Sequence, residues 1–263
     1  MFGATETPYD LRFRALGIPV RVHPLFWVIM AIIGWEPENL PVVLIFVGCA
    51  FLSILVHEYG HGLTAMRNGA PASIVLWGMG GLCYNDTSRQ TPGQRLAVIA
   101  AGPGAGFLLC GVTMMTYSAL FGLTFSDHLA FITQLARQPS EIGPGLRKLE
   151  YGLHAFNPRF EIYWDLVQIN IVWGVLNILP IWPLDGGRIC EIVLTRFYPY
   201  QGRRWTHVIS LLASGLLAVA IFTYTHSLFS TIFFGYFAFM NYQMLDSIHR
   251  AQTMGNYDDD SGR

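Results

Sequence analysis

The apolar residues of this 263-residue chain gather in six runs that are separated by more polar segments. A helix that crosses a bilayer needs roughly 20 predominantly apolar residues, and most of these runs are close to that length. The first run is the shortest, and it crosses only if Arg21 and His23 lie at the membrane interface. The pattern predicts about six transmembrane helices, near residues 22–35, 41–66, 96–125, 166–184, 208–224 and 228–245.

A different pattern lies between the second and third runs. Residues 72–77 and 82–84 are short strand-like segments on either side of Gly-Met-Gly-Gly, which is typical of a small hairpin. The predicted fold is therefore an all-α membrane protein with a small β strand-loop between its second and third helices. The predicted organisation is a segment at 1–21, a six-helix membrane domain at 22–247 with a polar linker at 126–161, and an acidic, solvated tail at 248–263 whose residues 255–263 are expected to be disordered.

Composition agrees with lipid as the surrounding solvent. Of all residues 52% are apolar and 13% are charged, whereas a soluble domain carries about a quarter charged residues. Sixteen basic and seventeen acidic residues leave no basic block that would bind nucleic acid. The four cysteines lie far apart, so we interpret them as small core residues: Cys49, Cys83, Cys110 and Cys190.

Basic residues predict the orientation. With six spans, twelve of the sixteen lie on the side that holds both termini, and four lie on the side of the 126–161 linker. Because basic loops stay in the cytoplasm, we expect both termini to be cytoplasmic and the linker to be extracytoplasmic. The N-terminus lacks the pattern of a signal peptide, and the short chain favours the cell membrane of a bacterium or archaeon.

The second apolar run holds the stretch "HEYGH", which places His57, Glu58 and His61 at membrane depth. On a helix His57 and His61 lie about 40° apart, so both imidazoles project from one face, one turn from each other. H-E-x-x-H is the zincin pattern, with two zinc ligands and a glutamate that acts as general base. Ionisable groups are costly in a membrane and usually mark a functional site.

A third zinc ligand is expected from Asp185 in "NILPIWPLDGG" at the end of the fourth run. Pro180 and Pro183 break the helix there, so the carboxylate can turn back into the bundle. Gly186 and Gly187 allow a sharp turn. Both motifs end their spans on the same side, so His57, His61 and Asp185 can converge.

Together, "HEYGH", "NILPIWPLDGG" and "AGPGAG" at 101–106 resemble motifs of the site-2 protease family of intramembrane zinc metalloproteases. The resemblance implies one zinc bound by His57, His61 and Asp185, with Glu58 as general base. It also implies cleavage of single-span membrane proteins within or near the bilayer. Unlike several members, this chain has no room for a PDZ or CBS module. Neither the substrate nor the oligomeric state follows from the sequence.

Further residues are candidates for roles around the zinc. Asn177 is the candidate second donor to the oxyanion, because it lies eight residues before Asp185 and the family motif has asparagine there. Asn170 lies two turns earlier on the same face, as a substrate contact or an interhelical hydrogen bond. Gly78, Gly80 and Gly81 would let a substrate backbone approach the strand-loop, or would simply shape an interfacial hairpin. "AGPGAG" is interpreted as a close helix-packing surface.

Three alternatives remain open. A zinc protease of another lineage, such as a prenyl-protein endopeptidase, would take a downstream glutamate as third ligand. A metal or proton transporter could use the same histidines and Asp185, although it needs no general base and internal repeats are not evident. A catalytically retired relative would only bind membrane helices.

Overall fold

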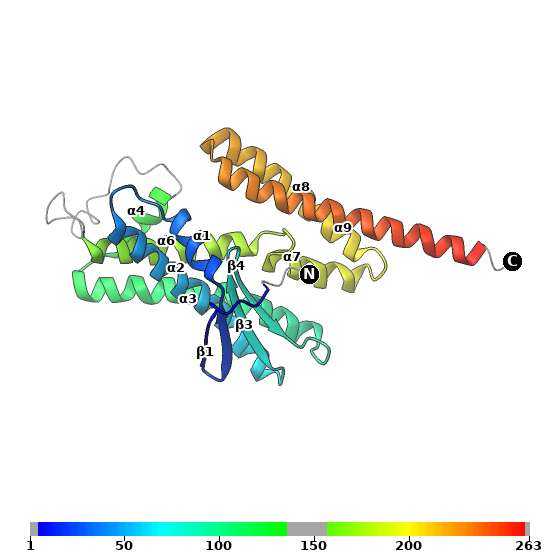
Figure 1. The fold of residues 1–263 in the computed structure, drawn as a ribbon, viewed down its shortest axis with the longest axis horizontal. Helices are drawn as coiled ribbons and strands as arrows, with labels where there is room; N and C mark the ends of the chain where they lie inside the picture. Colours follow the sequence, from blue (N-terminus) through cyan, green and yellow to red (C-terminus); the bar gives the residue numbers. More distant parts are fainter. Residues whose placement is uncertain (1–4, 136–156, 261–263) are drawn as a thin grey trace. The chain divides into compact units, whose positions relative to one another are not determined.

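The structure is a computed structural model that describes residues 5–135 and 157–260, with side chains at 5–133 and 157–250. It divides into two compact units, Met1–Val175 and Leu176–Arg263, which are described separately. Figure 1 shows the elements in chain order, with the strands in blue and cyan and the last helices in orange and red.

The first unit contains a four-stranded sheet in the order β1-β2-β3-β4. Its first two strands form an antiparallel hairpin, its second and third strands are parallel, and its last two form another antiparallel hairpin. Two helices connect the parallel strands, as a parallel crossover requires. The strands are β1 (Leu11–Ala15), β2 (Ile18–Val22), β3 (Ala72–Trp77) and β4 (Gly80–Asn85).

Two helices of this unit, α1 and α3, begin at a side-chain cap. His23 caps the short first helix, where its Nδ1 accepts a hydrogen bond from the Leu25 N–H at 3.1 Å. Thr91 and Gln94 form a reciprocal capping box at the start of α3, with Pro92 as its first residue. The helices are α1 (Pro24–Ile33), α2 (Leu40–Arg67), α3 (Pro92–Phe121), α4 (Phe125–Leu135) and α6 (Pro158–Ile178), whose last three residues belong to the second unit.

The core of the first unit lies between the sheet and α2, which packs against β3 and β4 (Figure 1). Alternation along β2 turns Ile18, Val20 and Val22 to the inside, and Ile74 and Leu76 of β3 lie beside them. These side chains pack in one cluster with residues of α1 and α2, including Phe26 and Ile54. The burial fixes the sheet to the helix that carries the histidines.

A second cluster joins α3, α4 and α6. Phe131 and Tyr163 are fully buried in it, and their ring centroids lie 5.4 Å apart. The hydroxyl of Tyr163 lies 2.6 Å from Nδ1 of His128, so this apolar cluster also satisfies its polar groups.

The second unit contains the end of α6 and three further helices: α7 (Asp185–Phe197), α8 (Gly202–Thr225) and α9 (Leu228–Asp260). A two-residue connection makes α8 and α9 an antiparallel pair (Figure 1). Asn241 of α9 lies 2.8 Å from Nδ1 of His207 of α8 and donates to the Trp182 carbonyl. These two buried side chains brace the loop before Asp185.

Three helices in the described part of the chain are long and apolar enough to cross a membrane: α2, α3 and α8. The chain is therefore a mostly helical membrane protein with a small sheet. Six spans are not established. The first predicted span is a ten-residue helix, about 15 Å long, and Val22 belongs to β2.

Two other expectations need correction. The strand-loop at 72–84 is half of a larger sheet, because residues 11–22 form a hairpin that pairs with β3. In this 11–22 hairpin the alternation of apolar and polar residues is short and interrupted by arginines, so the sequence pattern does not reveal the strands. The tail is not free of regular structure, because α9 continues through Asp260. The expected linker begins with α4, and residues 136–156 lie outside the described part.

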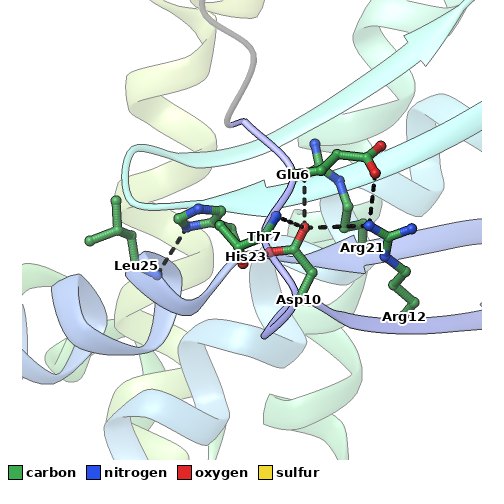
Figure 2. Close-up of polar contacts among 7 residues, drawn as sticks. All are labelled: Glu6, Thr7, Asp10, Arg12, Arg21, His23 and Leu25. Atoms are coloured by element: carbon green, nitrogen blue, oxygen red, sulfur yellow. Dashed lines mark hydrogen bonds and ion pairs between the residues drawn. The ribbon is translucent and has the colours of Figure 1, made fainter.

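A polar network holds the segment that precedes β1 (Figure 2). Asp10 accepts hydrogen bonds from the Thr7 hydroxyl at 2.6 Å and from Arg21 at 2.9 Å. These bonds lower the pKa of Asp10 from 3.8 to about 2. Arg12 forms a 2.8 Å ion pair with Glu6.

This network predicts a local acid transition. Because the folded state lowers the pKa of Asp10, its contribution to stability is complete above about pH 4 and is lost as the pH falls toward 2. We expect hydrogen-exchange protection of residues 5–22 to fall over this range in wild type. In Asp10→Asn the protection should be lower already at pH 5 and nearly independent of pH; an unchanged profile would contradict the assignment.

Candidate metal centre

His57, Glu58 and His61 lie on the buried side of α2. They are 3%, 4% and 7% exposed, and one ligand atom from each lies within 4.8 Å of the other two. The Nε2 atoms of the two histidines are 3.1 Å apart. Two imidazole ligands of a tetrahedral zinc have nitrogens roughly 3.3 Å apart, given Zn–N bonds of about 2.05 Å. The described side chains therefore fit a metal ion that both imidazoles bind through Nε2.

The tautomer of His61 is determined by a neighbouring helix. Its Nδ1 lies 2.8 Å from the carbonyl oxygen of Val98 in α3. Because a carbonyl oxygen can only accept, Nδ1 carries the proton and a neutral imidazole has its lone pair at Nε2. This backbone contact orients His61 as metal-binding histidines are usually oriented.

Glycines allow α3 to approach α2 this closely. A Cβ atom added at Gly102 of α3 would overlap the His61 ring. A Cβ atom at Gly60 of α2 would overlap the backbone carbonyl of Ala101. The interpretation of "AGPGAG" as a close packing surface is confirmed, and the surface it packs against includes the candidate ligand.

The sheet approaches Glu58 through β4. A Cβ at Gly81 would overlap the Glu58 side chain, so the first residues of β4 pass directly over the carboxylate. Gly80 has φ +116°, and a Cβ there would lie 2.7 Å from the Trp173 ring of α6. A Cβ at Gly78 would lie 3.1 Å from Ile29 of α1. The three predicted glycines thus shape a turn that is packed against three helices.

β4 is the last strand of the sheet, and among the described residues β3 is the strand that pairs with it. An exposed strand edge offers a row of backbone donors and acceptors to an extended chain. This edge begins beside Glu58.

Asn170 of α6 is buried and donates to the Ser53 hydroxyl of α2 at 2.9 Å and to the Leu166 carbonyl at 2.7 Å. The interhelical hydrogen bond, one of its two predicted roles, is therefore present. Gly106 of α3 lies beside it, since a Cβ there would be 3.3 Å from the Asn170 side-chain oxygen. These contacts connect α2, α3 and α6 one turn from the histidines.

In the second unit Asp185 is the first residue of α7 and is 6% exposed. A carboxylate is favourable at a helix N-terminus, where the backbone dipole is positive. Gly186 and Gly187 pack against the backbone of residues 178–182, where any Cβ would overlap. Asn177 is buried in the last turn of α6. Because Asp185 and Asn177 belong to the second unit, their convergence with the histidines stays a prediction.

Sequence reasoning did not identify Val98, Gly102 and Ser53 as partners of the site. In the sequence, Gly102 is a small residue and Ser53 a polar residue within apolar runs, which weakly indicates a role near the site. The contribution of Val98 is a backbone carbonyl, which no sequence pattern indicates. The predicted core role of the cysteines is confirmed for Cys49, Cys83 and Cys110, which are buried, while Cys190 is half-buried; none of the four forms a disulfide with a described residue.

Comparison with known proteins supports the same interpretation. Residues 45–221 match the model of peptidase family M50. A zinc metalloprotease of Methanocaldococcus jannaschii is 24% identical over 73% of this chain and 48% of its own length. Stage IV sporulation protein FB of Bacillus subtilis is 25% identical over 70% of this chain and 50% of its own. The chain thus spans about half the length of these curated relatives.

Among solved structures, the site-2 protease from Methanocaldococcus jannaschii has the same fold. The TM-score is 0.57 at 18% identity, over 90% of this chain and 95% of that one. Fold and site define a helical membrane protein with a candidate metal centre on its second helix. The chain belongs to peptidase family M50, the site-2 protease family.

Gly102 provides a test of the metal centre that leaves every candidate ligand in place. In Gly102→Ala the new methyl group must displace the His61 ring, so we expect zinc affinity to fall roughly 10- to 100-fold, as when a partner of a metal-binding histidine is lost. Zinc binding is measured by competition with a chelating dye. Gly104→Ala is the matched control, because nothing lies within 4 Å of its added Cβ. Equal affinities in both variants would contradict the placement of His61.

Proposed function

We propose that this protein is an intramembrane zinc endopeptidase that hydrolyses peptide bonds within or near the transmembrane segments of single-span membrane proteins. The observation that carries the proposal is the buried His57–Glu58–His61 cluster on a membrane-length helix, with His61 held in the ligating tautomer by α3. Family membership supports the reaction class.

His57 and His61 would hold one zinc through Nε2, and Asp185 would complete the protein ligands with one carboxylate oxygen. Zinc is preferred because two imidazoles and a carboxylate with an open position are its usual catalytic set. When bound, zinc lowers the pKa of water and polarises the scissile carbonyl. The site needs a polar path from the cytoplasm, because the bilayer core contains no water.

Glu58 acts as the general base. It lies next to His57 on α2 and below β4, so its carboxylate can take a proton from water beside the scissile bond and return it to the leaving amine. Asn177 is assigned as a hydrogen-bond donor to the oxyanion. A transporter would have no use for a carboxylate in this position.

The edge of β4 is the proposed substrate site. A transmembrane helix hides its peptide bonds in its own hydrogen bonds, so cleavage requires an extended segment. Pairing with β4 would supply that conformation, and the glycines at 78, 80 and 81 would bring the segment close to Glu58. Asn170 would support this region through α2. We propose the cell membrane as the location, with both termini cytoplasmic.

The general-base role is tested with Glu58→Gln, which removes the base and keeps the size of the side chain. We expect cleavage of a single-span substrate panel in detergent to fall on the order of 100- to 10,000-fold. Zinc content should remain near one per chain, as in wild type. Cleavage by Glu58→Gln at the wild-type rate would exclude Glu58 as the base. If wild type holds zinc but cuts no member of the panel, metal transport in vesicles becomes the alternative to test.

Gly81→Ala tests the approach of β4 to Glu58. The added methyl group overlaps the carboxylate, and the flexible side chain must move away. A displacement of about 1 Å in a catalytic group can cost on the order of 100-fold, so we expect that loss in kcat with unchanged zinc content. Tyr84→Ala is the control on the same strand, since Tyr84 is exposed at its far end. Full activity in Gly81→Ala would show that β4 does not position the base.

A further inference from the structure

The turn between β1 and β2 has an unfavourable residue at its tip. Leu16 and Gly17 have φ values of 50° and 79°, as in a type I′ turn, between the paired residues Ala15 and Ile18. Such turns favour asparagine, aspartate or glycine at the first position, and leucine rarely adopts this backbone conformation. Leu16 is nevertheless 68% exposed, so packing against the described residues does not explain its presence.

The tip lies against the last turn of α2. A Cβ at Gly17 would be 3.4 Å from the Met66 methyl group, and the Tyr59 hydroxyl donates to the Ala15 carbonyl. Leu63 lies one turn before Met66, and both are exposed. Since α2 is long enough to cross the membrane, its end marks a membrane surface. Leu16, Leu63 and Met66 therefore form an exposed apolar group, which we call the tip patch, at that surface.

Two basic residues flank the tip patch. Arg14 precedes the turn by two residues and Arg67 follows Met66, and both are exposed. Neither forms an ion pair or hydrogen bond with the residues that the structure describes. By contrast, Arg12 and Arg21 are paired with Glu6 and Asp10 (Figure 2). Two uncompensated positive charges thus surround exposed apolar side chains where a membrane helix ends.

We propose that the β1–β2 hairpin is a membrane-surface anchor that binds anionic phospholipids. The tip patch enters the interfacial layer of the bilayer, and Arg14 and Arg67 contact lipid phosphates. Apolar side chains with flanking arginines are the combination that binds such surfaces. The lipid contact explains why a leucine occupies a backbone position that favours asparagine. It also holds the sheet beside the membrane independently of any catalytic activity.

The first test measures the depth of the tip. Leu16→Cys, in a Cys190→Ser background, is labelled with a fluorophore in nanodiscs of phosphatidylcholine with phosphatidylglycerol. We expect stronger quenching by nitroxide-labelled lipid, and weaker quenching by aqueous iodide, than for the same label at Ser88→Cys in the exposed β4–α3 connection. Equal iodide and lipid quenching at the two positions would overturn the proposal.

The second test measures the contribution of the charges of Arg14 and Arg67 to lipid binding, separately from the depth of the tip. A basic residue near an anionic surface contributes about 1 kcal/mol, so Arg14→Gln and Arg67→Gln should each reduce the preference for phosphatidylglycerol over phosphatidylcholine roughly fivefold. Arg12→Gln is the matched control, because Arg12 is already paired, and it should leave the preference unchanged. An unchanged preference in all three variants would overturn the anionic-lipid assignment.

The Leu16→Asn variant tests whether Leu16 acts by contacting lipid or by shaping the turn. Asparagine suits the turn, so hydrogen-exchange protection of β1 and β2 should be kept or increased in detergent. In nanodiscs the same variant should lose the extra protection that lipid gives to residues 11–22 in wild type. Equal protection by lipid in both proteins would overturn the role of Leu16.

Discussion

The close approach of α3 to α2 is the constraint on which the candidate site depends. A membrane-length helix can carry two histidines and a glutamate only if protein groups replace the water that the bilayer excludes. Glycines at 60 and 102 remove the side chains that would separate the two helices, and the Val98 carbonyl then reaches His61. The same contact that satisfies the imidazole also leaves its other nitrogen available for metal. The packing of α3 against α2 therefore also orients His61 as a candidate metal ligand.

The sheet places a β-strand, β4, beside the candidate metal centre. Its core is continuous with α1 and α2, so β4 is held where Gly81 meets Glu58. A strand at the edge of the described sheet, beside a buried carboxylate, supports the proposed reaction on extended peptides. The proposed lipid contact of the hairpin at the other edge of the sheet would keep β4 near the membrane surface.

The sequence predicted the chemistry of the site better than its surroundings. The spacing of His57 and His61 was sufficient to place both imidazoles on one helix face, because helix geometry is local. The strand hairpin at 11–22 was missed, since its alternation is short and its pairing with β3 depends on residues fifty positions away. The first predicted span is not established as a crossing, because its helix has ten residues and hydropathy alone does not reveal that Val22 belongs to a strand. Val98 could not be found at all, because its contribution is a carbonyl that every residue has.

We propose that His57, His61 and Asp185 bind one zinc. The most direct measurement is an experimental structure of the zinc-loaded protein with anomalous scattering at the zinc absorption edge. We predict one peak about 2.0–2.2 Å from Nε2 of His57, Nε2 of His61 and a carboxylate oxygen of Asp185. A peak that the histidines bind without Asp185, or one at the cysteines, would contradict the account.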